Sequence, residues 1–250
     1  MAGKQLFIVT GATGGFGSAI LRQINLLYGE DAVIIACGRN KPKLDDVTKG
    51  FAAGVKHISV DFAERQGLKE RCQAIFDLAA GETFSAAYLY NNHGLASDVT
   101  RLAQDFDDSA EIEDYFFLNL TSFQVLTAVF LKNFSGVPHT CVNISSKCAV
   151  VAFPSMSLYC TGKAARLMLY KCLAAENPEV KVLNYSPGLM LTTMTENFHN
   201  TVAVDSTKKT FQAFKEGNLY VDTDESAKKM LGIVKEGSFT SGEQIDFHDC

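Results

Sequence analysis

"QLFIVTGATGGFG", residues 5–17, joins an apolar run to a glycine-rich turn, and the helix-forming stretch "SAILRQINLLY" follows it. The apolar run predicts a buried strand, so the order is strand, turn and helix. Gly11, Gly15 and Gly17 permit a tight turn and close backbone approach, and N–H groups at a helix N-terminus favour a pyrophosphate. The stretch therefore predicts a dinucleotide site, although an ordinary strand-to-helix turn has the same pattern.

The same rhythm continues along the rest of the chain. Short apolar runs alternate with helical stretches, and these runs are "AVIIAC", "VKHISV", "AAYLYNN", "HTCVNIS", "VKVLNYS" and, near the end, "QIDF". Several lack polar alternation, as expected of strands that helices cover on both faces. Right-handed crossovers between such strands yield a doubly wound Rossmann-type parallel sheet. We expect an α/β fold with helices on both faces and one domain over residues 1–250.

The segment 189–217 departs from this rhythm. It is polar and threonine-rich, and it lies between the sixth predicted strand and the last helix. Long connections in compact domains are uncommon and are usually functional. We expect a lid over the substrate; the alternative is a surface excursion with its own helix near residues 208–215.

Composition limits the possible partners and the cellular location. The chain has 250 residues, is nearly half apolar and carries a net charge of -5, which argues against a nucleic-acid or anionic-membrane surface. No stretch approaches eighteen uninterrupted apolar residues and residues 1–10 hold no signal segment, so we expect a cytoplasmic protein without a membrane span. Seven irregularly spaced cysteines fit reduced thiols and predict no metal site. The expected partners are small molecules or a second copy of the chain.

The end of the second strand indicates which nicotinamide cofactor is used. An acid that binds the NAD ribose usually stands there, about twenty residues after the glycine turn. Here the chain reads "ACGRNK", with Arg39 and Lys41 in place of the acid. A guanidinium suits a 2′-phosphate better than a carboxylate does, so we predict NADP(H). The alternative is that Arg39 is only a solvated charge at the strand end.

"SLYCTGK", residues 157–163, places Tyr159 and Lys163 four positions apart. In a helix both side chains lie on one face and can point into one cleft. The spacing alone is weak, because a chain with eight tyrosines and this many lysines gives it by chance on the order of one time in two. Its meaning depends on the surrounding motifs.

Those motifs occur in a diagnostic order: Thr10-Gly11-x-x-x-Gly15-x-Gly17, "YNNHG", Asn119, "NISS" and "YCTGK". With them the chain resembles the short-chain dehydrogenase/reductase family over nearly its whole length. The longer strings "LNLTS", "VNISSKCA", "LYCTGKAAR", "VLNYSPG" and "SGEQIDFHDC" are similar to those of its pterin-reducing members. The resemblance implies an NADPH-dependent reductase of pterin side-chain carbonyls. A general reductase of small diketones or aldehydes, and a non-catalytic NADP(H)-binding sensor, remain as alternatives.

The resemblance assigns four catalytic positions. Tyr159 protonates the substrate carbonyl, and Lys163 holds the nicotinamide ribose and, with the oxidised nicotinamide, lowers the tyrosine pKa. Ser146, in preference to Ser145, orients the carbonyl, although both serines could simply satisfy the end of a strand. Asn119 supports a water relay to the lysine; the alternative is an exposed asparagine on a helix.

The resemblance also implies the residues that bind cofactor and substrate. Asp61 contacts the adenine or, as simply, caps the next helix. Pro187 and Gly188 direct the chain over the nicotinamide and Thr192 reaches the cofactor, unless they only shape a turn. Asp246 anchors a pterin; the alternative is a solvated terminal acid. The full cofactor set is Gly11, Thr13, Gly15, Phe16, Gly17, Arg39, Asn40, Asp61, Phe62, Asn92, Gly94, Tyr159, Lys163, Pro187, Gly188 and Thr192, and the substrate set is Ser146, Tyr159 and Asp246.

Three positions depart from the family pattern. His93 replaces an alanine, Gly14 stands where the pterin-reducing members commonly have an arginine for the 2′-phosphate, and Leu191 replaces an acid. We expect His93 to be packed and hydrogen-bonded rather than catalytic. The resemblance further implies a homodimer that packs through residues 119–133 and 159–175, although the same apolar residues suit the core of a monomer.

Overall fold

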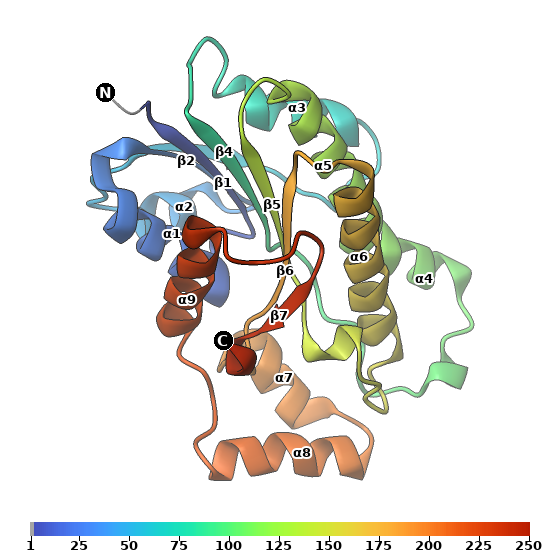
Figure 1. Ribbon diagram of the computed structural model, residues 1–250. Coiled ribbons are helices and arrows are strands. Elements are labelled where there is room, and N and C mark those ends of the chain that lie inside the picture. Colours follow the sequence, from blue (N-terminus) through green and yellow to red (C-terminus); the bar gives the residue numbers. More distant parts are fainter. Residues whose placement is uncertain (1–2) are drawn as a thin grey trace.

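Seven parallel strands form the centre of the molecule in a computed structural model that describes residues 3–250 (Figure 1). Their order in the sheet is β3-β2-β1-β4-β5-β6-β7. The strands are β1 (Gln5–Thr10), β2 (Ala32–Gly38), β3 (Gly54–Ser59), β4 (Ala86–Asn91), β5 (His139–Ile144), β6 (Lys181–Ser186) and β7 (Gln244–Asp246). Each of the seven apolar runs of the sequence forms one strand, and the predicted doubly wound α/β fold is confirmed.

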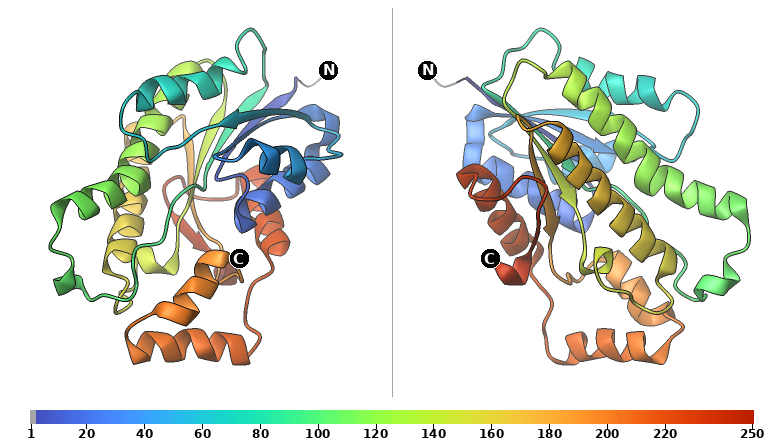
Figure 2. Two further views of the ribbon diagram at one scale, coloured as in Figure 1. Left: turned by 180° about the vertical axis from the view of Figure 1, so that it is seen from behind. Right: turned by 45° about the vertical axis from the view of Figure 1, so that its right-hand side comes forward.

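Nine α-helices of the described chain surround this sheet. They are α1 (Gly15–Tyr28), α2 (Lys41–Val47), α3 (Leu68–Asp77), α4 (Ser109–Phe116), α5 (Ser122–Asn133), α6 (Ser157–Glu176), α7 (Thr193–Thr201), α8 (Asp205–Glu216) and α9 (Thr223–Glu236). Helices α1, α2 and α9 cover one face, and α3, α5 and α6 cover the other (Figures 1 and 2). Successive side chains of a strand point to opposite faces of the sheet. In β1, Phe7 and Val9 therefore pack on the side of α1, and Leu6 and Ile8 pack on the side of α3.

A π-helical segment, Phe117–Thr121, joins α4 to α5 into one helix over Ser109–Asn133. By length and composition alone this helix could cross a membrane, with a mean hydropathy of 1.3. Its side chains Leu126, Val129 and Phe130 instead lie in the core beside β4 and β5. Packing in the folded domain therefore accounts for the buried apolar side chains of this helix, although only 39% of the apolar window is buried.

The segment 189–217 forms two helices, α7 and α8, beyond the carboxyl ends of the strands (Figure 1). The helix near residues 208–215, which belonged to the alternative of a surface excursion, corresponds to α8, and the sequence did not predict α7. Phe198 and Phe211 are buried with Val99 and Met156 in a small core of their own. This segment is therefore a packed helical unit.

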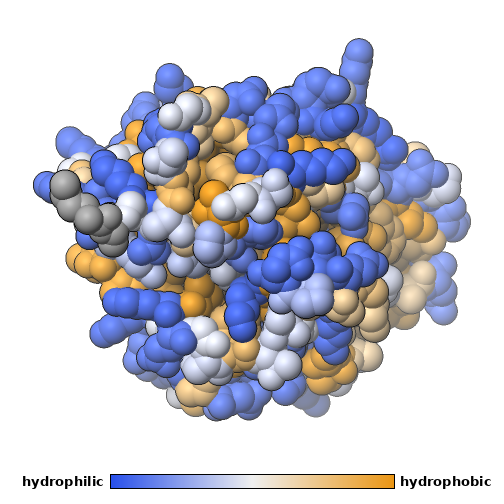
Figure 3. Space-filling model, turned by 45° about the horizontal axis from the view of Figure 1, so that its top comes forward, coloured by the Kyte–Doolittle hydropathy of each residue, from blue (hydrophilic) through white to orange (hydrophobic). Residues whose placement is uncertain are grey.

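The surface seen in Figure 3 is mixed in character. Hydrophilic residues separate several small hydrophobic areas on this face. Scattered apolar residues of this kind are normal on a folded domain.

Candidate active site

A cavity of about 660 Å³ lies where the strands end, between the sheet and the segment 189–217. Crevices at the carboxyl ends of parallel strands are where α/β proteins bind their ligands. The predicted site residues that line it are Gly11, Thr13, Gly15, Phe16, Gly17, Arg39, Asp61, Phe62, Asn92, Gly94, Asn119, Ser146, Tyr159, Lys163, Pro187, Gly188, Thr192 and Asp246. Asn40 does not line it, because its side chain caps α2 by accepting from the Lys43 N–H at 3.0 Å.

The turn between β1 and α1 is built so that only glycine fits. Gly11 has a φ of +61°, and a Cβ at Gly17 would lie 2.1 Å from the Gly11 carbonyl oxygen. The N-cap of α1 is Gly14, which has no side chain to satisfy the N–H groups, and the first turn has no acid. These N–H groups and the helix dipole can therefore receive an anion such as a pyrophosphate.

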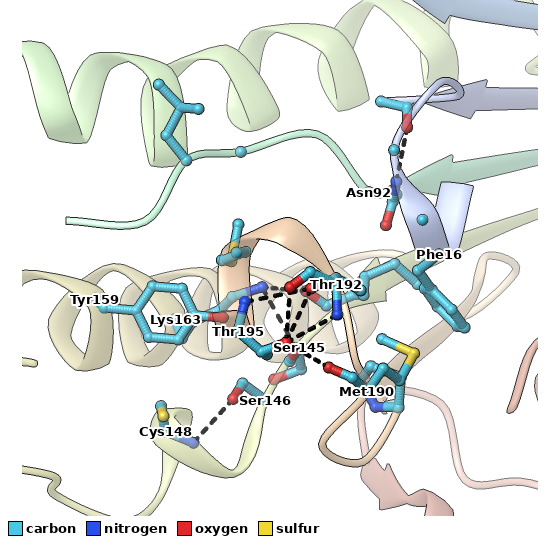
Figure 4. A pocket seen from close by; sticks show the side chains of 18 of the residues that line it. Phe16, Asn92, Ser145, Ser146, Cys148, Tyr159, Lys163, Met190, Thr192 and Thr195 are labelled. Carbon is cyan, nitrogen blue, oxygen red and sulfur yellow. Dashed lines mark hydrogen bonds between the residues drawn. The ribbon is translucent and has the colours of Figure 1, made fainter. Parts of the chain in front are cut away.

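Tyr159 and Lys163 lie one turn apart on α6 and face the same cavity (Figure 4). The Lys163 Nζ donates to the Ile144 carbonyl oxygen at 2.8 Å and lies 5.6 Å from the centre of the Tyr159 ring. The end of β5 thus holds the lysine beside the tyrosine. The spacing that was weak in the sequence corresponds to a real pair in the fold.

Burial sets the protonation of this pair. It raises the pKa of Tyr159 well above its ordinary value, with Cys148 and Tyr115 adding to the shift and Arg166 opposing it. The lowered tyrosine pKa that we expected in the complex with oxidised nicotinamide stays a prediction for that complex. For the protein alone, loss of hydration outweighs the nearby charge and raises the pKa. A phenol with a raised pKa keeps its proton at neutral pH, which suits an acid in a reduction.

The two serines at the end of β5 have different partners. The Ser145 hydroxyl donates to the Gln244 Oε1 at 2.7 Å, so its proton is already committed. The Ser146 Oγ accepts from the Cys148 N–H at 3.1 Å, which leaves its proton available for a substrate oxygen. The preference for Ser146 over Ser145 therefore has a structural reason.

Asn119 is buried inside the π-helical segment rather than exposed on a helix surface. Its Oδ1 accepts from the Leu95 N–H, and its Nδ2 donates to the Tyr115 carbonyl, each at 3.0 Å. π-Helical turns are rare and are frequent at functional sites. The alternative of an ordinary exposed asparagine is therefore wrong.

The residues expected at the cofactor also shape the local backbone. The Asp61 Oδ1 accepts from the Ala63 N–H at 2.9 Å, and the next helix is capped by Gly67, so Asp61 does not cap it. Thr192 caps α7. Gly188 has a φ of +77°, and a Cβ there would lie 2.6 Å from Val221. Asp61, Thr192 and Gly188 therefore shape the local backbone and also line the cavity.

The departures from the family pattern have clear structural settings. His93 is stacked between Phe62 and Phe123, with ring centres 4.0 and 4.1 Å away, and its two nitrogens contact the hydroxyls of Thr10 and Ser122. Burial lowers its pKa well below the usual value, so the ring is neutral. The expectation of a packed, hydrogen-bonded histidine is confirmed.

Gly14 lines the cavity, whereas Leu191 does not. Gly14 places no cation beside the glycine turn, so Arg39, at the end of β2, is the cation on that wall. Leu191 is 58% exposed at the start of the segment 189–217.

Asp246, at the end of β7, is held in place by two hydrogen bonds. Its Oδ2 accepts from the Ser186 hydroxyl at 2.6 Å, and its Oδ1 accepts from the His248 N–H at 3.1 Å. It is half-buried on the cavity wall rather than free in solvent. Because each carboxylate oxygen has a second lone pair, both can still accept from a ligand.

Sequence reasoning missed several residues of the cavity. Arg166 lies at the cavity on the same face of α6 as Tyr159 and Lys163, and its spacing of three from Lys163 was the available signal. The apolar wall that faces the catalytic pair comes from Phe153, Met156, Met194, Phe198, Phe211 and Phe214. No local pattern in a polar segment marks such a wall.

Comparison with known proteins agrees with this fold. The family model described as short chain dehydrogenase matches residues 5–203. The chain therefore belongs to the short-chain dehydrogenase family, a family of oxidoreductases. Among its relatives, the sepiapterin reductase of Bos taurus is 36% identical over 255 residues, covering 99% of this chain and 96% of the relative.

More distant proteins share the same architecture. The benzil reductase ((S)-benzoin forming) of Bacillus cereus is 27% identical, covering 95% of this chain and 97% of the relative. The crystal structure of the KRED1-Pglu enzyme superposes with a TM-score of 0.87 at 20% identity, covering 97% of this chain and 100% of that one. At this identity the structural likeness concerns the fold alone.

Proposed function

We propose that this protein is an NADPH-dependent reductase of the side-chain carbonyls of a reduced pterin, a step of tetrahydrobiopterin synthesis. The observation that carries the proposal is that one cavity brings Ser146, Tyr159 and Lys163 together with the fixed carboxylate of Asp246. The similarity to sepiapterin reductases over nearly the whole chain supports the choice of a pterin.

The cavity fits a phosphorylated dinucleotide. The glycine turn offers free N–H groups to a pyrophosphate, and Arg39 offers a guanidinium to a 2′-phosphate. When bound, NADPH supplies the hydride. Lys163, fixed by the Ile144 carbonyl, is placed to hold the ribose.

The chain's own residues then guide proton transfer. The Ser146 hydroxyl donates to the carbonyl oxygen and orients it, and this hydrogen bond strengthens as negative charge develops there. Tyr159 gives its phenolic proton to that oxygen while the carbonyl carbon is reduced. Asn119, whose amide is fixed between two backbone groups, supports a water relay that returns a proton through Lys163.

Helices α7 and α8 act as the lid in this proposal. Their side chains Met194, Phe198, Phe211 and Phe214 form an apolar wall opposite the catalytic pair. A wall of this kind excludes water from the reacting carbonyl and receives the flat face of a pterin ring.

A second candidate is a reductase of small diketones. It is favoured by the apolar wall and by the benzil reductase among the relatives, since benzil is an aromatic diketone. A third candidate is an NADP(H)-binding sensor without turnover. Such a sensor would not need Ser146, Tyr159 and Lys163 together. Incubating the purified protein with NADPH and, in turn, sepiapterin, simple diketones and a steroid ketone separates all three. Absence of turnover with every substrate would contradict both enzymatic proposals.

We expect NADPH to bind more tightly than NADH, and Arg39→Ala to remove most of this difference. One charge-assisted contact is worth roughly 1.5–3 kcal/mol, so NADPH affinity should fall at least about tenfold. Titration of each cofactor by fluorescence measures this, with Lys49→Ala as the control because exposed Lys49 does not line the cavity. Equal affinity of the native protein for both cofactors would refute the NADPH assignment.

The proposal extends to a cytoplasmic homodimer. All seven cysteines are free thiols, which fits a reducing compartment. On the segments expected at the interface, Met168 is 60% exposed, and Leu120 and Leu169 are only partly buried. Light scattering of the purified protein should give a mass near twice the 27.2 kDa of one chain.

A further inference from the structure

Arg166, on α6, is a buried cation without an acidic partner. It is 2% exposed, and among residues 3–250 no carboxylate oxygen forms an ion pair with it. Its Nη2 donates to the Asn143 Oδ1 at 2.7 Å, and its guanidinium carbon lies 3.6 Å from the centre of the Phe123 ring. Amide oxygens and an aromatic face therefore replace water around this charge.

Arg166 and Lys163 share one hydrogen-bond acceptor. The Ile144 carbonyl oxygen accepts from the Lys163 Nζ at 2.8 Å and from the Arg166 Nη2 at 2.9 Å. The guanidinium Nη1 lies on the other side, 3.7 Å from where a Cβ at Gly94 would be. Two like charges thus meet at one oxygen beside Tyr159, and each disfavours the charge on the other.

Of Arg166 and Lys163, the Arg166 guanidinium is the group that stays charged at neutral pH. Burial lowers the pKa of Arg166 to about 10, so it stays protonated at neutral pH. The pKa of Lys163 falls well below its usual value, first through burial and then through Arg166. The other titratable groups that act on the pair in the described chain are Tyr159 and Tyr170 of α6, Tyr115 of α4, Cys148 after β5 and His93 after β4. None of these groups is a carboxylate.

We propose that Arg166 is a positioning residue for proton transfer: it fixes the carbonyl that holds Lys163, and its permanent charge keeps Lys163 ready to release a proton. The inference rests on the proposed reductase. Once Tyr159 has given its proton to the substrate oxygen, the phenolate takes a proton from the Lys163 ammonium, which then recovers one from solvent. A neighbouring guanidinium favours both the phenolate and the neutral amine.

The first test compares Arg166→Gln, which removes the charge, with Arg166→Lys, which keeps it. Without the charge, Tyr159 and Lys163 hold their protons more tightly. The high-pH limb of kcat for carbonyl reduction should therefore move up by roughly one pH unit, and kcat at neutral pH should fall by roughly tenfold. Arg166→Lys should keep the native pH profile.

Arg22→Gln, which removes a half-exposed guanidinium away from the cavity, should leave both the pH profile and kcat at neutral pH unchanged. Equal losses in the Gln and Lys variants with an unshifted profile would show a purely structural role.

The second test needs no substrate. Cyanate reacts with neutral amines, so peptide mass spectrometry of protein treated over a range of pH follows the charge on Lys163, with exposed Lys171 of the same helix as reference. In the native protein, Lys163 should become reactive at a lower pH than Lys171, and Arg166→Gln should raise its midpoint by roughly one pH unit. The same midpoint for both lysines in the native protein would overturn the inference, even if Arg166→Gln fails to fold. The expected labelling without reduction of any carbonyl would instead overturn the proposed function.

Discussion

Replacing Tyr159 by phenylalanine should abolish carbonyl reduction while NADPH still binds. The change removes only the phenolic hydroxyl, and a positioned general acid typically contributes about 10²–10⁴ in rate. The ring itself packs edge-on against Phe198, with centres 5.6 Å apart, and phenylalanine preserves that contact. Binding should be measured by NADPH fluorescence and turnover by NADPH oxidation, so that the two effects separate.

A matched control is Tyr28→Phe. Tyr28 is a partly buried tyrosine of α1 that packs against Phe7 and does not line the cavity. Tyr28→Phe also removes a phenolic hydroxyl, and turnover by this variant should stay near the native value. Near-normal turnover in Tyr159→Phe would show that another group supplies the proton.

The second large effect is expected at Asp246, the residue that separates a pterin reductase from a general carbonyl reductase. A pterin presents a 2-amino group and an adjacent ring N–H, which one carboxylate can accept together. Asp246→Asn replaces one acceptor by a donor and sets N–H against N–H. We expect kcat/KM for sepiapterin to fall by roughly two orders of magnitude, a loss of about 3 kcal/mol.

The diketone reaction provides the control for Asp246. A small diketone has no such pair of donors, so its kcat/KM should change little in Asp246→Asn. The remaining carbonyl oxygen of the asparagine can still accept from the His248 N–H, and the Ser186 hydroxyl can turn to accept from the new NH2 group, which helps to keep the strand in place. Equal losses on both substrates would show that Asp246 supports the fold or the cofactor instead.

The sequence was sufficient for the sheet because each strand is a short apolar run that helices cover on both faces. It was insufficient for α7, where threonines and two asparagines are poor helix formers and the burial of Phe198 and the cap by Thr192 decide the structure. Tertiary contacts of this kind leave no local pattern.

The candidate site was likewise only partly predictable from the sequence. The order of motifs carried a resemblance to a family, and that resemblance was enough to predict that Ser146, Tyr159 and Lys163 belong together. The direction of the Tyr159 pKa shift was not predictable, because it depends on how much protein covers the ring. Arg166 was overlooked for a related reason: a cation with no acid nearby is recognised as buried only once the fold is known.

Strand β7 contains three residues and pairs with β6 alone, at the edge of the sheet. Its Asp246 meets Ser186 across 60 residues of chain, so the contact closes a long loop. Such an edge is among the first parts of a domain to open by local fluctuation. If Asp246 anchors a pterin as proposed, opening of β7 would limit the fraction of molecules able to hold the substrate, and we expect substrate recognition to be lost on warming before the domain itself unfolds.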